Sequence, residues 1–143
     1  MRRITGLFVG CLLSLCCFVS TSAADEAPPY FSRYVGQYPS VVLKNESDLS
    51  SRVRQTLGSN YALFKERMQT ETPFEQVGAA IVATGCMQHN CSIEDAALII
   101  NLLDGKVTCV IHSTKWGGKS KYWDEDDASL PKAALQHALD AWN

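Results

Sequence analysis

A six-residue segment bounded by two cysteines limits the folds open to this chain. The segment is Cys86-Met87-Gln88-His89-Asn90-Cys91, and the residues on both sides of it read as β-strands. Two cysteines with four residues between them can close a small covalent loop. A tight loop between strands lies at the surface, because buried loop backbone would leave N–H and C=O groups unpaired. The sequence therefore predicts a rigid, protruding loop with His89 near its tip.

The strands around this segment have a clear pattern. Residues 81–86 and 93–102 read as strands, and Asp104-Gly105 between two apolar runs predicts a two-residue hairpin turn. That turn pairs Ile100 with Cys109. One face of the hairpin is then wholly apolar and is predicted to be core: Ala96, Leu98, Ile100, Leu102, Val107, Cys109 and Ile111.

This register bears on the pairing of the cysteines. Cys109 lies on the core face in mid-strand, where a free cysteine behaves as a small hydrophobe. It is badly placed to reach Cys86 or Cys91 at the strand ends. Outside the cytosol thiols oxidise, so two of the three cysteines Cys86, Cys91 and Cys109 should form a disulfide. We predict a Cys86–Cys91 disulfide and a buried free thiol at Cys109.

Residues 1–24 have the pattern of a secretory signal peptide. Arg2 and Arg3 precede an apolar run, and small residues allow cleavage after Ala23 or Ala24. A membrane helix is an alternative, but the run is short for a bilayer crossing. A lipoprotein signal is another, at one of three cysteines in this region. The expected location is the periplasm or the extracellular space, with no membrane association after the signal is removed.

The remaining chain is one domain's worth of sequence. Removal of residues 1–24 leaves 119 residues, enough for a modest core. The formal net charge changes from −2 to −4, because Arg2 and Arg3 are removed with the signal. This balance argues against nucleic acid or an anionic membrane as partner and mildly favours a basic partner.

The predicted fold class is α+β, with about five antiparallel strands and helices on one face or at the ends. Residues 25–44 are expected to form an extended leader, and residues 45–143 the single domain. The acidic run Asp124–Asp127 is read as a solvated turn before the last helix. Helices are also predicted at residues 45–57, 59–68 and 129–142. Short strands are predicted at residues 74–77 and 121–123.

Three interpretations of the loop are open. It can be a disulfide loop that only stabilises the fold, with a histidine that has no function. It can be a zinc site with Cys86, His89, Cys91 and His112 as ligands, although the usual ligand pairs are spaced otherwise and a disulfide competes. It can also recognise a partner by insertion, since a preorganised loop loses little entropy on binding. A protonated His89 donates from both ring nitrogens, which suits a cleft with two carboxylates such as that of a glycosidase.

An enzyme is not favoured, and no cofactor or metal is predicted. Cys86 and His89 have the residue types of a thiol nucleophile and its base, but a sulfur in a disulfide is not a nucleophile. The six-residue loop also leaves no room for a third group that would orient the histidine. The sequence contains no Gly-rich phosphate loop, Gly-x-Ser-x-Gly or His-Glu-x-x-His motif.

Cys86-x-x-His89-x-Cys91 between strands, in an exported α+β protein of this size, resembles the Ivy family, inhibitors of vertebrate (c-type) lysozyme. The family loop reads Cys-Lys-Pro-His-Asp-Cys, so Met87-Gln88 replaces Lys-Pro and Asn90 replaces Asp. The resemblance covers roughly residues 61–113. It implies a five-stranded antiparallel sheet with flanking helices and a bridged loop that plugs the lysozyme active site.

The resemblance also implies a partner and its contacts. His89 would contact the catalytic carboxylates, with Met87, Gln88 and Asn90 beside it in the interface. The expected partner is a c-type lysozyme, a basic enzyme toward which the acidic run would steer this protein. The alternative is a non-catalytic binding domain of the same fold with a different partner. A homodimer is left open.

Overall fold

A computed structural model describes residues 30–125 and 131–142. The predicted signal peptide, the lipoprotein alternative and the predicted first residues of the last helix lie outside the described residues. Among those described, no helix is both long and apolar enough to cross a bilayer.

The described residues form an antiparallel sheet with helices on both sides, which confirms the α+β class. The sheet has six strands in the order β1-β3-β4-β5-β6, and β2 pairs with β3 beside β1. The strands are β1 (Thr70–Glu71), β2 (Glu75–Val77), β3 (Ala80–Cys86), β4 (Glu94–Asn101), β5 (Val107–Ser113) and β6 (Lys119–Asp124). The helices are η1 (Tyr30–Tyr34), α1 (Pro39–Asn45), α2 (Ser47–Leu57), η2 (Gly58–Asn60), α3 (Tyr61–Arg67), η3 (Thr114–Trp116) and α4 (Lys132–Asp140).

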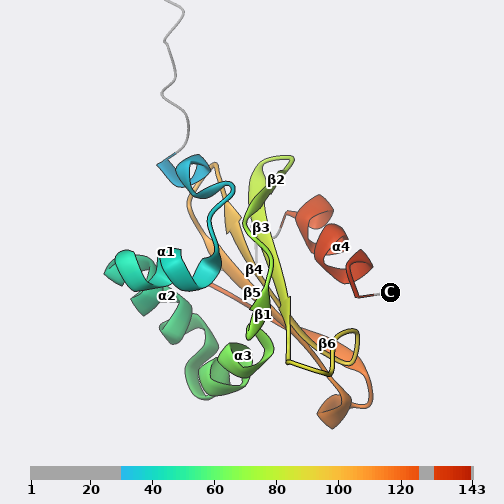
Figure 1. The fold of residues 1–143 in the computed structure, drawn as a ribbon. Helices are drawn as coiled ribbons and strands as arrows, with labels where there is room; N and C mark the ends of the chain where they lie inside the picture. Colours follow the sequence, from blue (N-terminus) through green and yellow to red (C-terminus); the bar gives the residue numbers. More distant parts are fainter. Residues whose placement is uncertain (1–29, 126–130, 143) are drawn as a thin grey trace, which may run out of the picture.

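Two cores lie on the two faces of the sheet. Helices α1, α2 and α3 cover one face, and α4 covers the other (Figure 1). The apolar hairpin face predicted from the sequence belongs to the first core, under α1–α3. The opposite face of the sheet is covered as well, because α4 packs there. Small residues on α4, Ala134 and Ala138, allow a close approach to Val82, Ile99 and Val110.

The extended conformation predicted for residues 25–44 is wrong for the described part. Residues 30–34 form η1 and residues 39–45 form α1, with Pro39 in the first turn, where its fixed φ suits a helix. Tyr34 and Val42 are buried in the first core. The aromatic and apolar residues in this stretch therefore add to the domain core.

The predicted hairpin register is wrong by two residues. Ile100 pairs with Val107, and Leu98 pairs with Cys109. The turn is longer because the Asn101 side-chain oxygen accepts a hydrogen bond from the Leu103 N–H (2.9 Å). An Asn side chain that bonds its own backbone two residues on mimics a turn. A shift of two residues keeps every side chain on its face, so the predicted core face is unchanged.

Helix α3 is held directly against β3 beside the disulfide. Gly85 allows this contact: a Cβ there would lie 2.8 Å from Met68 Sδ and 3.0 Å from Met68 Cα. Any larger residue at position 85 would push the end of α3 away from the sheet. Gly85 thereby fixes the position of α3 next to Cys86.

Candidate functional site

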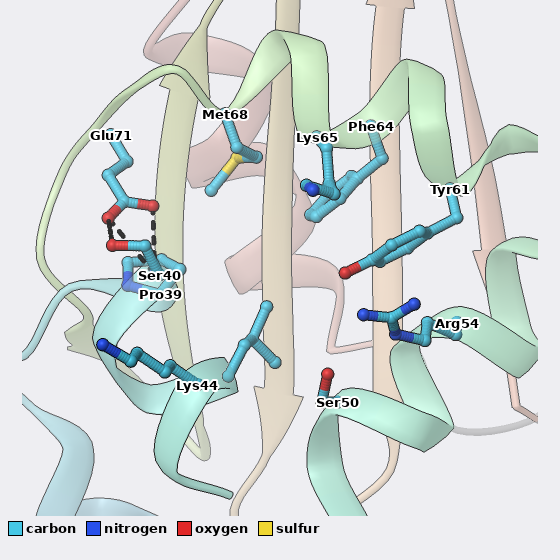
Figure 2. A pocket seen from close by; sticks show the side chains of 11 residues that line it. Pro39, Ser40, Lys44, Ser50, Arg54, Tyr61, Phe64, Lys65, Met68 and Glu71 are labelled. Carbon is cyan, nitrogen blue, oxygen red and sulfur yellow. Dashed lines mark hydrogen bonds between the residues drawn. The ribbon is translucent and has the colours of Figure 1, made fainter. Parts of the chain in front are cut away.

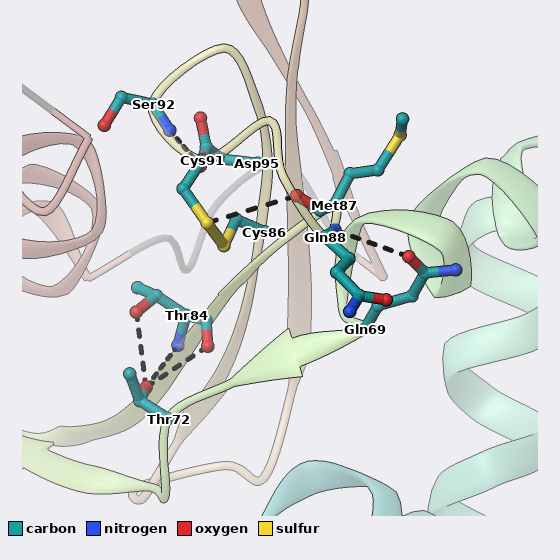
Figure 3. The surroundings of a disulfide bond; sticks show 9 residues. All are labelled: Gln69, Thr72, Thr84, Cys86, Met87, Gln88, Cys91, Ser92 and Asp95. Atoms are coloured by element: carbon teal, nitrogen blue, oxygen red, sulfur yellow. Dashed lines mark hydrogen bonds between the residues drawn. A yellow bond between two sulfur atoms is a disulfide. The ribbon is translucent and has the colours of Figure 1, made fainter.

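The predicted disulfide between Cys86 and Cys91 is present, with their Cα atoms 4.9 Å apart (Figure 3). Cys86 is the last residue of β3, and β4 begins at Glu94, so residues 87–93 make the connection. The other prediction for the cysteines is confirmed too, because Cys109 is a free, buried thiol. Burial raises the pKa of the Cys109 thiol well above its usual range.

The loop backbone is closed by its own hydrogen bonds. The Met87 N–H donates to the Glu94 carbonyl oxygen (2.8 Å) at the base, and the Asn90 N–H donates to the Met87 carbonyl oxygen (2.9 Å) above it. The Glu94 N–H donates to the Asn90 carbonyl oxygen (3.0 Å). Both Met87 and Asn90 are thus tied to Glu94, the first residue of β4.

His89 occupies a constrained backbone position. It is the third residue of the turn that Met87 and Asn90 close, and its φ is 68°. A positive φ at that position is typical of a type II turn, where glycine or asparagine is preferred. Histidine is several-fold enriched among the non-glycine residues that adopt it. The turn therefore sets the direction in which the chain presents position 89.

The four loop residues predicted to bind a partner differ in exposure. Gln88 and His89 are exposed, whereas Met87 and Asn90 are half-buried. The prediction of an imidazole outside the core agrees with this placement of His89. A residue that the sequence did not single out joins them: Ile93, predicted as a strand residue, is 47 % exposed at the end of the loop.

A buried charge network supports one side of the loop. The Arg67 guanidinium, 2 % exposed, pairs with the Glu94 carboxylate. Glu94 also accepts hydrogen bonds from the Ser113 hydroxyl (2.8 Å) and from the Thr114 N–H (3.0 Å) and hydroxyl. Burial alone would raise the pKa of Glu94, but the hydrogen bonds from Thr114, Ser113 and Arg67 lower it to about 2. Glu94 is a charged anchor at the start of β4.

A second carboxyl group supports the other side. Asp95, 2 % exposed, accepts a hydrogen bond at Oδ1 from the Ser92 N–H (2.9 Å; Figure 3). Its Oδ2 atom and Trp142 Nε1 are buried without a partner among the described residues, and both residues line a pocket of about 180 Å³ under the disulfide. Burial raises the pKa of Asp95. Neighbouring residues on β4 thus hold the loop from opposite faces of the sheet.

The zinc and thiol-enzyme interpretations both require a free thiolate at Cys86 or Cys91. Cys86 and Cys91 are bridged, so neither offers a thiolate. His112, the fourth ligand of the zinc interpretation, contacts the Ser120 hydroxyl through Nδ1 (3.1 Å). Within residues 30–125 and 131–142, no cluster of three or more His, Cys, Asp or Glu side chains is placed to hold a metal ion.

The described part of the acidic run, Asp124 and Glu125, lies at the opposite end of the sheet from the loop. Asp124 pairs with Thr108 near the β4–β5 turn, whereas the loop lies near Ser113 at the other end of β5. Glu125 accepts hydrogen bonds from the Arg52 guanidinium (2.6 and 2.8 Å) and from the Val107 N–H (2.9 Å). This part of the run is bound to the domain instead of forming a solvated turn. Residues 126 and 127 lie outside the described residues.

Taken together, these features define a small α+β protein that presents a disulfide-closed loop at one end of an antiparallel sheet. The family model for the inhibitor of vertebrate lysozyme (Ivy) matches residues 48–143. This match covers most of the chain, and the chain belongs to the Ivy family. Comparisons with curated proteins and with solved structures gave no match. Family membership supports lysozyme inhibition as the general function and confirms the resemblance seen in the loop.

Proposed function

We propose that this protein inhibits c-type lysozyme by placing the Cys86–Cys91 loop in the active-site cleft, with His89 against the catalytic carboxyl groups. One observation carries the proposal. In a member of an inhibitor family, an exposed histidine lies in a backbone-closed turn within a disulfide loop.

An imidazole suits the chemistry of the cleft. Retaining glycosidases carry two carboxyl groups roughly 5–5.5 Å apart. A protonated imidazole donates from both ring nitrogens, so one ring can hydrogen-bond to both groups. Charge-assisted hydrogen bonds of this kind are shorter and stronger than neutral ones. His89 would occupy the place where the scissile bond of the substrate lies and block it.

The loop is suited to insertion because it is ordered before binding. Its base is fixed by the disulfide and by the Met87–Glu94 hydrogen bond. Its two flanks are fixed by Glu94 and Asp95. A loop held in one conformation loses less entropy when it binds, which strengthens binding without any new contact.

The departures from the family loop are partly offset by a new contact. Gln88 replaces a proline, which would have no N–H to donate. Here the Gln88 N–H points to the Gln69 side-chain oxygen at 3.4 Å, a long hydrogen bond that ties the loop to the end of α3 (Figure 3). The stiffness that proline gives the family loop is thus replaced in part by a tertiary contact.

The interface would extend beyond the loop tip. Met87, Asn90, Ile93 and Lys115 line a shallow hollow of about 300 Å³ beside the loop. The exposed Ile93 and the half-buried Met87 give this surface apolar contact area. The family loop carries a lysine at the position that Met87 occupies in this chain. Lys115 supplies a basic side chain in its place. We propose this surface as the rim of the lysozyme contact.

The proposal includes export to the periplasm or the extracellular space. The signal-peptide pattern of residues 1–24 supports it, as does a disulfide that is maintained in oxidising compartments. Expression of the whole chain in a bacterium, followed by fractionation and intact-mass measurement, tests it. Export predicts a mature chain that begins at Ala24 or Asp25. A full-length chain retained in the cytosol would contradict it.

A cell-wall lysis assay tests the inhibition. The purified protein should inhibit c-type lysozyme, and a substrate oligosaccharide bound in the cleft should compete with it. A cell-wall amidase, which lyses the same cells by cleaving an amide bond, serves as the control enzyme. No inhibition of c-type lysozyme at micromolar protein would favour the alternative, a binding domain with another partner. Inhibition without competition would remove loop insertion as the mechanism.

A further inference from the structure

A second site lies among the N-terminal helices, on residues that the loop does not use. A pocket of about 260 Å³ is formed where α1, α2 and α3 meet (Figure 2). Its apolar floor consists of Pro39, Leu43, Phe64 and Met68, of which Phe64 and Met68 belong to the buried core. The pocket is partly open to solvent.

Basic side chains gather at the mouth of this pocket. The Arg54 guanidinium lies 4.6 Å from the centre of the Tyr61 ring, and Lys65 Nζ lies 6.0 Å from the same ring. Figure 2 shows the Arg54 guanidinium and the Tyr61 and Ser50 hydroxyls pointing toward the space between α2 and α3. A third basic residue, Lys44, also lines the pocket.

These cations pair with no acidic residue that the structure describes. In the part of the chain that the structure describes, Lys44, Arg54 and Lys65 form no ion pair. Among the described residues that line the pocket, Glu71 is the only one with a carboxylate, and it accepts hydrogen bonds from the N–H and the hydroxyl of Ser40. The three basic side chains are exposed and give the mouth of the pocket an excess of positive charge, although the formal net charge of the chain is −2.

We propose that this pocket binds a small amphipathic carboxylate, such as a medium-chain fatty acid. The carboxylate would lie between Arg54 and Lys65, where charge-assisted hydrogen bonds are available. The Tyr61 and Ser50 hydroxyls would donate further hydrogen bonds. The apolar tail would cover Leu43, Phe64 and Met68 and remove their surface from water.

The size of the pocket sets the size of the ligand. Small-molecule pockets usually measure roughly 300–1,000 Å³, so a volume of about 260 Å³ lies just below that range. It suits one short acyl chain or one ring, and excludes a diacyl lipid. Both the carboxylate and the apolar tail of the ligand are needed. An anion without a tail leaves the apolar floor of the pocket exposed to water, and a tail without an anion leaves the basic side chains unpaired.

An NMR titration of the isotope-labelled protein tests the proposal, with octanoate, acetate and 1-octanol as probes. Octanoate should bind saturably, with the largest amide shifts at Leu43, Tyr61 and Phe64. Acetate and 1-octanol should bind at least tenfold more weakly. Equal binding of octanoate and 1-octanol would overturn the proposal, and so would shifts spread evenly over the surface.

Variants separate the basic side chains from general effects of charge. Arg54→Gln and Lys65→Gln should each weaken octanoate binding about tenfold, the effect of one charge-assisted hydrogen bond. Lys132→Gln is the matched control, because Lys132 is exposed on α4 on the other face of the sheet. Thermal unfolding of each variant checks that it is folded. Unchanged affinity in both folded variants would contradict the proposal. Lysozyme inhibition should be the same in all three, so this site and the loop can fail independently.

Discussion

Arg67 and Glu94 form a buried ion pair directly beneath the disulfide loop, and this pair joins the end of α3 to the start of β4. Glu94 also closes the loop through its backbone, since its carbonyl oxygen accepts from the Met87 N–H. One residue therefore links the loop, the helix and the β5–β6 connection. The stability of the loop and the stability of the fold are coupled at this residue.

Glu94→Gln should destabilise the protein by roughly 3–5 kcal/mol, because it removes the buried partner of the Arg67 guanidinium and leaves only the half-exposed Glu66 carboxylate as a counter-charge. Urea unfolding measures the change. Glu66→Gln is the matched control, since Glu66 pairs with the same guanidinium from a position that is 48 % exposed. That variant should lose no more than about 1 kcal/mol. Equal losses in the two variants would contradict the role given to Glu94.

The same residue predicts a dependence of stability on pH. The folded-state pKa of Glu94 is lowered from 4.5 to about 2, so its ionised form is favoured in the folded protein. Its contribution to the free energy of unfolding is complete above pH 4.5 and is lost as the pH falls toward about 2. Between these values, stability should fall less steeply in Glu94→Gln than in the unaltered protein. Parallel curves would show that Glu94 is not the titrating group.

Asp95 is predicted to change stability with pH in the opposite direction. Burial raises its pKa in the folded protein, so the ionised carboxylate destabilises the fold above that pKa, and the penalty is relieved as the pH falls. Asp95→Asn keeps an oxygen for the Ser92 N–H and removes the buried charge. It should leave the midpoint of thermal unfolding at neutral pH unchanged or higher. A clear fall in the midpoint would mean that the charge itself stabilises the loop.

The disulfide and the free thiol give a further test. Reaction of the mature protein with a thiol reagent should detect no thiol when folded and one after unfolding, since Cys109 is buried and its pKa is raised. Substitution of both Cys86 and Cys91 by serine should lower stability by roughly 2 kcal/mol, the entropy effect of so short a loop. Rapid reaction of Cys109 in the folded protein would contradict its place in the core.

The sequence predicted the parts of the fold that follow from local pattern. The alternation of apolar residues around Leu98 and Ile100 placed their side chains on the core face, and this survived a register error because the error was an even number of residues. The disulfide followed from the same pattern. The error itself came from Asn101, whose side-chain hydrogen bond lengthens the turn and leaves no signal in the Asp104-Gly105 pair.

The supports of the loop could not be predicted in the same way. Arg67 lies at the end of a short helix, where a basic residue is ordinarily exposed, and the packing of α3 on the sheet buries it beside Glu94 and Ser113. Its partner, Glu94, is distant in sequence. Helix α1 was missed because aromatic and proline residues before it suggested an extended chain, whereas the burial of Tyr34 and Val42 stabilises it. Both depend on contacts between distant segments.

The dissociation constant of the His89→Asn variant for c-type lysozyme tests the central claim most directly. Asparagine tolerates the left-handed backbone, so the φ of 68° is preserved while the imidazole is lost. We expect binding about 30-fold weaker than that of the unaltered protein, the loss typical of a central interface residue, with the thermal unfolding midpoint unchanged. An unchanged dissociation constant in this folded variant would contradict the account.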